Sequence, residues 1–121
     1  MGFGKTVPIL RMFDERKARE FYVDFLGFII DWEHRFEDGA PLYMQVSKDG
    51  CVIQLSEHYG DASPGAAVRI ETTEVDAFQQ QLSEKKYKYA RPGVPQETPW
   101  GTKEIGIKNP FGNKLIFANR A

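Results

Sequence analysis

Hydrophobic and polar residues alternate most regularly near the end of the chain, where two short runs flank a turn. The runs are Thr102–Lys108 (TKEIGIK) and Lys114–Phe117 (KLIF). Between them, residues 109–113 read Asn-Pro-Phe-Gly-Asn, whose proline and glycine supply turn conformations that strand residues do not adopt. This pattern predicts a β-hairpin. Trp100 precedes its first strand and stands next to Gly101, where the backbone can approach a ligand closely.

A helical pattern stands near the start of the chain. Between Asp14, an N-cap candidate, and Gly27, apolar residues recur at helical spacing, at Ala18, Phe21, Tyr22, Phe25 and Leu26. Residues 7–13 read as a strand in which Pro8 favours an edge position, because proline cannot donate to a ladder. After the helix, turn compositions separate three further predicted strands, at 28–36, 41–47 and 51–57.

The same order of elements begins again after the turn-rich segment Gly60–Gly65. Residues 66–71 predict a strand and residues 74–86 an amphipathic helix, and strands are predicted at 87–90, 102–108 and 114–117. The sequence therefore predicts a single α+β domain, 1–121. It is built from two βαβββ modules, 1–60 and 61–121, that form a cupped mixed sheet.

Side-chain alternation gives each predicted strand one face that packs on a helix and one face that lines the hollow of the sheet. The packing positions are Ile53, Leu55, Val68, Ile70, Leu115 and Phe117. The hollow positions are Val52, Gln54, Ser56, Ala67, Arg69, Glu71, Lys114 and Ile116. The hollow therefore mixes polar and apolar side chains. Two interpretations stay open for Arg69 and Glu71, namely a binding role and simple solvation of an open sheet face.

Composition and charge exclude several classes of function. The 121 residues carry a formal charge of −1, with basic and acidic residues interspersed, so no basic stripe is predicted for a nucleic acid. No apolar run approaches the roughly 18 residues of a membrane span, and no signal peptide is evident, which favours a cytoplasmic protein. Cys51 is the only cysteine, so no internal disulfide forms, and its position on a packing face predicts an inert thiol.

The chain has two histidines, His34 and His58, each preceded by a glutamate. Glu57 and His58 are consecutive at a strand end and point in different directions, which argues against a shared metal site. His34 stands close to Trp32 and Phe36 in the sequence. It is expected to be an exposed strand histidine or to flank the hollow.

Three segments carry a resemblance to a known family: Pro8–Phe28, Val52–His58 and Pro99–Phe117. They resemble the glyoxalase/bleomycin-resistance/extradiol-dioxygenase superfamily, also called vicinal oxygen chelate, and most of all its bleomycin-resistance proteins. The most specific part is the Pro-Trp-Gly run, with a glutamate three residues after the glycine and the Asn-Pro-Phe-Gly-Asn turn. The resemblance covers the whole chain. It implies paired βαβββ modules and a homodimer with two ligand crevices across its interface, whose first strand is exchanged in some members.

The metal-dependent members of the family place His, Gln or Glu ligands in the first and last strand of each module. On this chain the resemblance maps those positions to Val7, Gln54, Ala67 and Ile116. Three of the four have no donor atom, and Gln54 alone does not hold a divalent ion. The expectation is therefore no metal, no other cofactor and no catalysis by the family's metal route.

We therefore expect a binding protein that sequesters a bulky, flat and cationic small molecule, and the resemblance implies bleomycin-type glycopeptides. Trp32, Phe36, Tyr43 and Trp100 are expected to stack on the ligand, with Gly101 beside them. Glu71 and Glu104 are expected to neutralise its cationic groups. Gln54, Ser56 and Arg69 are expected to donate or accept hydrogen bonds.

Three interpretations stay open at this point. A formal charge of −1 gives little electrostatic attraction for a strongly cationic drug, so the ligand of such a binding protein can also be another metabolite. A metal-dependent glyoxalase or dioxygenase with non-standard ligands is the second interpretation. The third is a ligandless structural dimer, in which Trp100 plugs the core.

Overall fold

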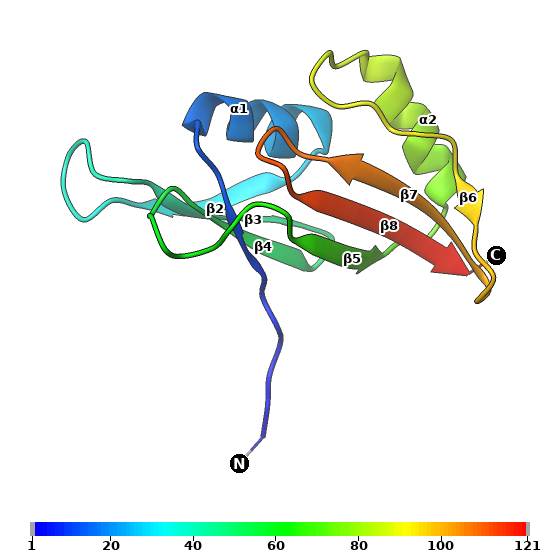
Figure 1. Ribbon diagram of the computed structural model, residues 1–121, viewed down its shortest axis with the longest axis horizontal. Coiled ribbons are helices and arrows are strands. Elements are labelled where there is room, and N and C mark those ends of the chain that lie inside the picture. Colours follow the sequence, from blue (N-terminus) through cyan, green and yellow to red (C-terminus); the bar gives the residue numbers. More distant parts are fainter. Residues whose placement is uncertain (1, 121) are drawn as a thin grey trace.

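The computed structural model describes residues 2–120 (Figure 1). The elements of the first half are β1 (Ile9–Arg11), α1 (Glu15–Arg19), the π-helix η1 (Glu20–Phe25), β2 (Ile29–His34), β3 (Tyr43–Lys48) and β4 (Cys51–Ser56). Those of the second half are β5 (Ala67–Glu71), α2 (Val75–Lys85), β6 (Gln96–Glu97), β7 (Thr102–Lys108) and β8 (Lys114–Arg120). The predicted α+β class and the repeated order of elements are confirmed. Among residues 2–120, no helix has the length and apolarity needed to span a bilayer.

Each half contributes a four-stranded mixed sheet of the same topology. The first sheet has the strand order β1-β4-β3-β2, and the second has the order β5-β8-β7-β6. In both sheets the first strand of the half runs parallel to its last strand, and the other neighbours are antiparallel. A parallel pair needs a crossover connection, to which the helix of each half contributes.

The helices lie on the same side of both sheets, and the first residues of the chain extend away on the other side (Figure 1). Strand side chains that point toward the helices form most of the core. The fully or nearly buried ones are Met44, Val46, Ile53, Leu55, Ile105, Ile107, Leu115 and Phe117. The alternation read from the sequence therefore holds. We call the sheet faces that point away from the helices the open faces.

The first helix begins as predicted but changes its winding. Asp14 caps it, because its Oδ1 accepts a hydrogen bond from the backbone N–H of Lys17 at 3.0 Å. In η1 the hydrogen bonds widen to the π pattern, and Phe21, Tyr22 and Phe25 are all buried. The wider turn lets consecutive aromatic residues share the face that packs on the first sheet.

Residues 87–90 do not form the strand that the sequence predicts. Lys86 ends α2 in a left-handed conformation with φ of 51°, and the ring of Tyr87 then packs on that of Phe25, with centroids 5.1 Å apart. The strand that pairs with β7 is β6 instead. Tyr87 and Tyr89 pack on the helical layer. Their spacing resembles the alternation of a strand, which is why the strand prediction for 87–90 is wrong.

The Asn-Pro-Phe-Gly-Asn turn joins the two halves. Asn109 Oδ1 accepts hydrogen bonds from the backbone N–H groups of Phe111 and Asn113, both at 2.9 Å. Asn109 Nδ2 donates to the hydroxyl of Tyr22 at 3.0 Å, and Asn113 Nδ2 donates to the carbonyl of Arg11 at 3.2 Å. Burial raises the pKa of Tyr22, so its hydroxyl stays neutral. The predicted turn therefore also anchors the second half of the chain to the first.

Candidate functional site

The open face of the first sheet and the segments next to it bring five aromatic rings together. Trp32 and Tyr43 stack with their planes 6° apart and their centroids 5.9 Å apart. The His58 ring lies 6.4 Å from Tyr43 and 5.8 Å from Phe36, and Phe36 lies 4.8 Å from His34. We call this series the aromatic row. It is open to solvent, because Phe36 is 79% exposed and Trp32 is 41% exposed.

A β-bulge in β2 turns Trp32 to the open face. Ile30 pairs with Val46, but Trp32 pairs with Gln45, so Asp31 is an extra residue on this strand. Val46 is buried under the helices, whereas Gln45 lies on the open face. Strict alternation from Ile30 would place Trp32 on the helix side. The bulge is therefore what adds Trp32 to the aromatic row, and alternation alone does not reveal it.

An ion network holds the segment that carries Phe36. Arg35, its neighbour, pairs with Glu15 of α1. The carboxylate of Glu57 lies 3.9 Å from Arg35 and accepts a hydrogen bond from the backbone N–H of Leu42 at 2.8 Å. The segment between β2 and β3 is thus fixed at both ends, which limits the freedom of the exposed Phe36 ring.

Polar side chains form a second series across the same open face. The Tyr43 hydroxyl donates to Gln54 Oε1 at 2.6 Å, and Gln54 Nε2 donates to Gln45 Oε1 at 3.0 Å. Gln45 Nε2 and Ser47 Oγ then donate to the two carboxylate oxygens of Asp31, both at 3.0 Å. Burial raises the pKa of Tyr43, which keeps its hydroxyl a neutral donor. Asp31 was not among the predicted site residues, and it became part of this face through the bulge.

Ser56 does not take the role that the sequence predicts. It is fully buried, although its register places it on the open face. Its hydroxyl donates to Asp61 at 2.6 Å and accepts from the backbone N–H of His58 at 3.0 Å, while Arg11 donates to the His58 carbonyl. Ser56 therefore holds the turn that carries His58, and it has no surface left for a ligand.

The open face of the second sheet is dominated by an ion pair. Arg69 makes two hydrogen bonds to the carboxylate of Glu104, at 3.3 and 2.5 Å, and Thr102 donates to the same carboxylate at 2.7 Å. The Arg69 guanidinium, followed by Thr102, holds the pKa of Glu104 below its usual range. Because Arg69 already matches the charge of Glu104, this pair must break before Glu104 can neutralise a cationic ligand as predicted. Glu71 is exposed and has no ion-pair partner among residues 2–119.

Trp100 lies in the tight turn between β6 and β7. The backbone N–H of Thr98 donates to the Thr102 carbonyl at 2.8 Å, and that of Gly101 donates to the Thr98 carbonyl at 3.2 Å. Gly101 has a φ of 91°, a conformation that favours glycine. Trp100 is 67% exposed, so the interpretation that it plugs the core is wrong.

The structure divides the ten predicted site residues into two groups. The group of the first sheet is Trp32, Phe36, Tyr43, Gln54 and Ser56, and the group of the second is Arg69, Glu71, Trp100, Gly101 and Glu104. Within residues 2–120, no hydrogen bond, ion pair or ring contact joins one group to the other. They form two partial surfaces, each on its own sheet.

The donor set does not fit the divalent metal that some members of the resembled family hold. Val7, Ala67 and Ile116 offer no donor atom, and the Gln54 amide is already bonded to Tyr43 and Gln45. Across residues 2–120, no group of three or more His, Cys, Asp or Glu residues is placed to hold a metal ion.

Comparisons with known proteins agree with this fold. The family model described as "Glyoxalase superfamily protein" matches residues 1–121. TnmS3, an antibiotic binding protein from Streptomyces sp. CB03234, is 24% identical over 100% of this chain and 99% of its own, with a TM-score of 0.79. A bleomycin-binding protein solved in complex with bleomycin is 20% identical over 98% of this chain and 100% of its own, with a TM-score of 0.73. The bleomycin resistance determinant of transposon Tn5 is 18% identical over 98% of both chains, again with a TM-score of 0.73. No curated protein matches the chain.

Proposed function

Because the chain belongs to the glyoxalase superfamily, we propose that it is a small-molecule binding protein of the bleomycin-resistance type. In this proposal it sequesters a bulky, flat and cationic ligand, such as a bleomycin-type glycopeptide, and performs no metal-dependent catalysis. Structures of the same fold include a bleomycin-binding protein and an antibiotic binding protein, which supports the proposal.

The observation that carries this proposal is the exposure of the aromatic row. Large aromatic side chains on a single-chain surface mark a binding site when they are contiguous and open to solvent. The faces of Trp32 and Phe36 offer stacking area, and aromatic faces attract cations as well as flat rings. Asp31 lies beside this row and supplies a negative charge.

We further propose that two copies complete the site. The aromatic row lies on the first sheet, whereas Trp100 and Glu71 lie with the second sheet, and both open faces are exposed within one chain. A homodimer that sets the first open face of one protomer against the second open face of its partner would enclose a ligand between them. The exposed Phe3, at 96%, belongs to the extended segment before β1 and supports a role for this segment in the dimer. Sedimentation analysis tests this, and a monomer at every concentration would reject it.

Tryptophan fluorescence tests ligand binding, because Trp32 and Trp100 are the only tryptophans of the chain. Titration with metal-free bleomycin is expected to quench emission and to saturate at about one ligand per chain. In the single-tryptophan variants Trp32→Phe and Trp100→Phe, the remaining tryptophan should still respond, because both surfaces contact the ligand. A response from one tryptophan alone would reject the shared site.

A matched pair of variants locates the binding surface. Phe36→Ala removes an exposed ring from the aromatic row, and affinity should fall roughly tenfold because a stacking or cation–π contact is lost. Tyr89→Ala removes an exposed ring that packs on Lys17 of the helical layer, and affinity should not change. Equal effects of the two variants, or no quenching up to about millimolar bleomycin, would argue against the proposal.

Our proposal also places the protein in the cytoplasm, with no nucleic acid or membrane partner. The lone Cys51 and the mixed distribution of charge support this placement.

A further inference from the structure

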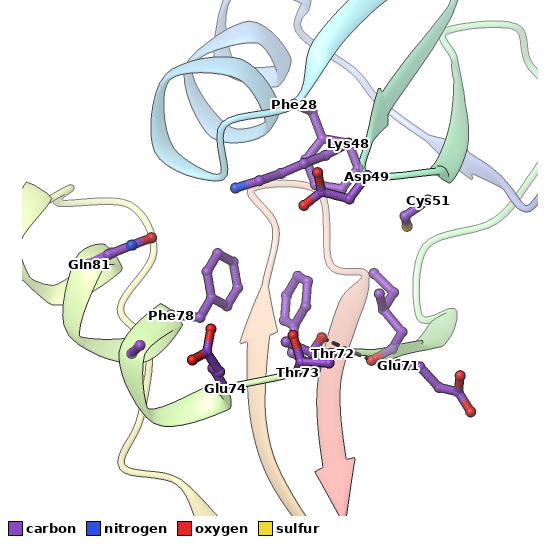
Figure 2. A pocket seen from close by; sticks show the side chains of 13 residues that line it. Phe28, Lys48, Asp49, Cys51, Glu71, Thr72, Thr73, Glu74, Phe78 and Gln81 are labelled. Atoms are coloured by element: carbon purple, nitrogen blue, oxygen red, sulfur yellow. Dashed lines mark hydrogen bonds between the residues drawn. The ribbon is translucent and has the colours of Figure 1, made fainter.

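A cavity lies on the helix side of the sheets, away from the aromatic row. It opens between the turn that joins β3 to β4 and the start of α2 (Figure 2). Its volume is about 520 Å³, within the range of small-molecule sites. The first half of the chain supplies one wall and the second half supplies the other.

The inner lining of this cavity is apolar and largely aromatic. Its apolar side chains are Phe28, Cys51, Ile70, Ala77, Phe78 and Phe117. Phe28 and Phe117 are nearly buried, whereas Phe78 and Ile70 are only partly buried, so apolar surface faces the cavity. Phe78 meets Phe117 edge to face with centroids 4.9 Å apart. A flat hydrocarbon group that enters here would remove that surface from water.

Two carboxylates stand on opposite sides of the mouth. In Figure 2, Asp49 points into the gap from the β3–β4 turn and Glu74 from the residue just before α2, whereas the carboxylate of Glu71 turns away. Within residues 2–119, neither Asp49 nor Glu74 has an ion-pair or side-chain hydrogen-bond partner. Unmatched negative charge beside an apolar surface favours a cationic group.

Lys48 also lines this cavity, and its ammonium group contacts a backbone carbonyl and an aromatic ring. Lys48 Nζ donates to the carbonyl of Leu26 at 3.1 Å and lies 5.3 Å from the centroid of the Phe78 ring. The ammonium therefore binds the carbonyl of Leu26 at the end of the first helix and lies near the Phe78 ring. It forms no ion pair with Asp49 or Glu74 among residues 2–119.

The backbone at Glu74 is consistent with a role beyond folding. Glu74 precedes α2 with a φ of 57°, in the left-handed region where glycine is favoured. The side chain makes no capping hydrogen bond, and the N–H of Val75 donates to Asn119 Oδ1 at 3.1 Å. The carbonyl of Glu74 accepts a hydrogen bond from the N–H of Phe78 at 3.1 Å, but its carboxylate makes no hydrogen bond at the helix start and is free to meet a ligand.

We propose that this cavity binds a small hydrophobic monocation of the aralkylammonium class. Its aromatic ring packs against Phe78 and Ile70, and its ammonium group lies between Asp49 and Glu74. Since the walls come from both halves of the chain, such a ligand also ties the halves together. This site is separate from the open faces and from the ligand proposed for them.

Cys51 reports on occupancy, because it lines this cavity and is the only cysteine of the chain. The probe is benzyltrimethylammonium, with 2-phenylethanol as the neutral control. The reagent is iodoacetamide, which is uncharged; alkylation rates are compared per thiolate, because a nearby charge also changes the pKa of the Cys51 thiol. At ten times its dissociation constant, the cationic probe should slow alkylation of Cys51 about tenfold by mass action. The neutral control should protect much less.

Variants that remove the carboxylates make this test specific. Asp49→Asn and Glu74→Gly should each weaken protection by the cationic probe, and Glu74→Gly should fold at least as well as the parent because it relieves the left-handed backbone. Glu37→Gln changes an exposed acid in the segment between β2 and β3 and is the matched control. In this variant the cationic probe should protect Cys51 as well as in the parent. The proposal is overturned if the neutral compound protects as well, if both carboxylate variants keep full protection, or if about 10 mM cation does not protect.

Discussion

Removal of the Asn109 side chain should be among the most damaging single changes in this protein. Asn109 is buried, and its Oδ1 accepts hydrogen bonds from two backbone N–H groups whose residues, Phe111 and Asn113, are also buried. In Asn109→Ala each of these N–H groups loses its partner, at about 1 to 3 kcal/mol apiece. The lost bond to the Tyr22 hydroxyl adds about 1 kcal/mol. Because some relaxation and water entry will offset the sum, we expect a loss of about 3 kcal/mol in the free energy of unfolding.

Urea unfolding, followed by fluorescence and circular dichroism, measures this loss. Tyr22→Phe should cost only about 1 kcal/mol, and the double variant should show a coupling of about 1 kcal/mol, because both single changes remove the same bond. The exposed Gln80→Ala on α2 is the control and should stay within about 0.5 kcal/mol. A loss below about 1 kcal/mol for Asn109→Ala, with an unchanged denaturant slope, would refute the claim that this turn anchors the halves.

Three further predictions follow from charged and titratable groups. Arg69→Gln should raise the pKa of Glu104 toward its ordinary value in a carboxyl NMR titration, because Arg69 is the main cause of its depression; an unchanged value would contradict the ion pair. Burial raises the pKa of the Cys51 thiol, so iodoacetamide should alkylate it more slowly at pH 7 than free cysteine, and equal rates would contradict this. Glu15 has its pKa lowered below 4.5, first by Arg19, so its stabilisation is present above pH 4.5 and is lost as the pH falls through the lowered value. Glu15→Gln should therefore flatten the acid side of the stability profile by less than about 1 kcal/mol, since the pair is partly exposed, and an unaltered profile would count against the pairing.

Much of the fold could be predicted from the sequence because local signals agreed with tertiary packing. Asp14 and the turn at 109–113 carry short-range signals, and the alternation of 114–117 reflects a sheet with one face under a helix. Residues 87–90 show where this fails. Tyrosines that dock on a helix alternate as they would in a strand, and only the position of β6 beside β7 distinguishes the two cases.

The site could be predicted only in part, for a similar reason. The sequence identified Trp32, Phe36 and Tyr43 as aromatic, but the bulge that places Trp32 and the turn that brings His58 to the row depend on pairing partners far along the chain. Alternation placed Ser56 correctly on the open face. It could not show that the following turn covers it, because burial depends on contacts that a single strand does not encode.

The most direct test of the account is to map bleomycin on the protein by amide chemical-shift changes, since the central claim is that the two open faces together form the ligand site. The account predicts changes around the aromatic row on the first sheet and around Trp100 and Arg69 on the second, with the helical layer unaffected. Changes confined to the helical layer, or none at saturating bleomycin, would contradict it.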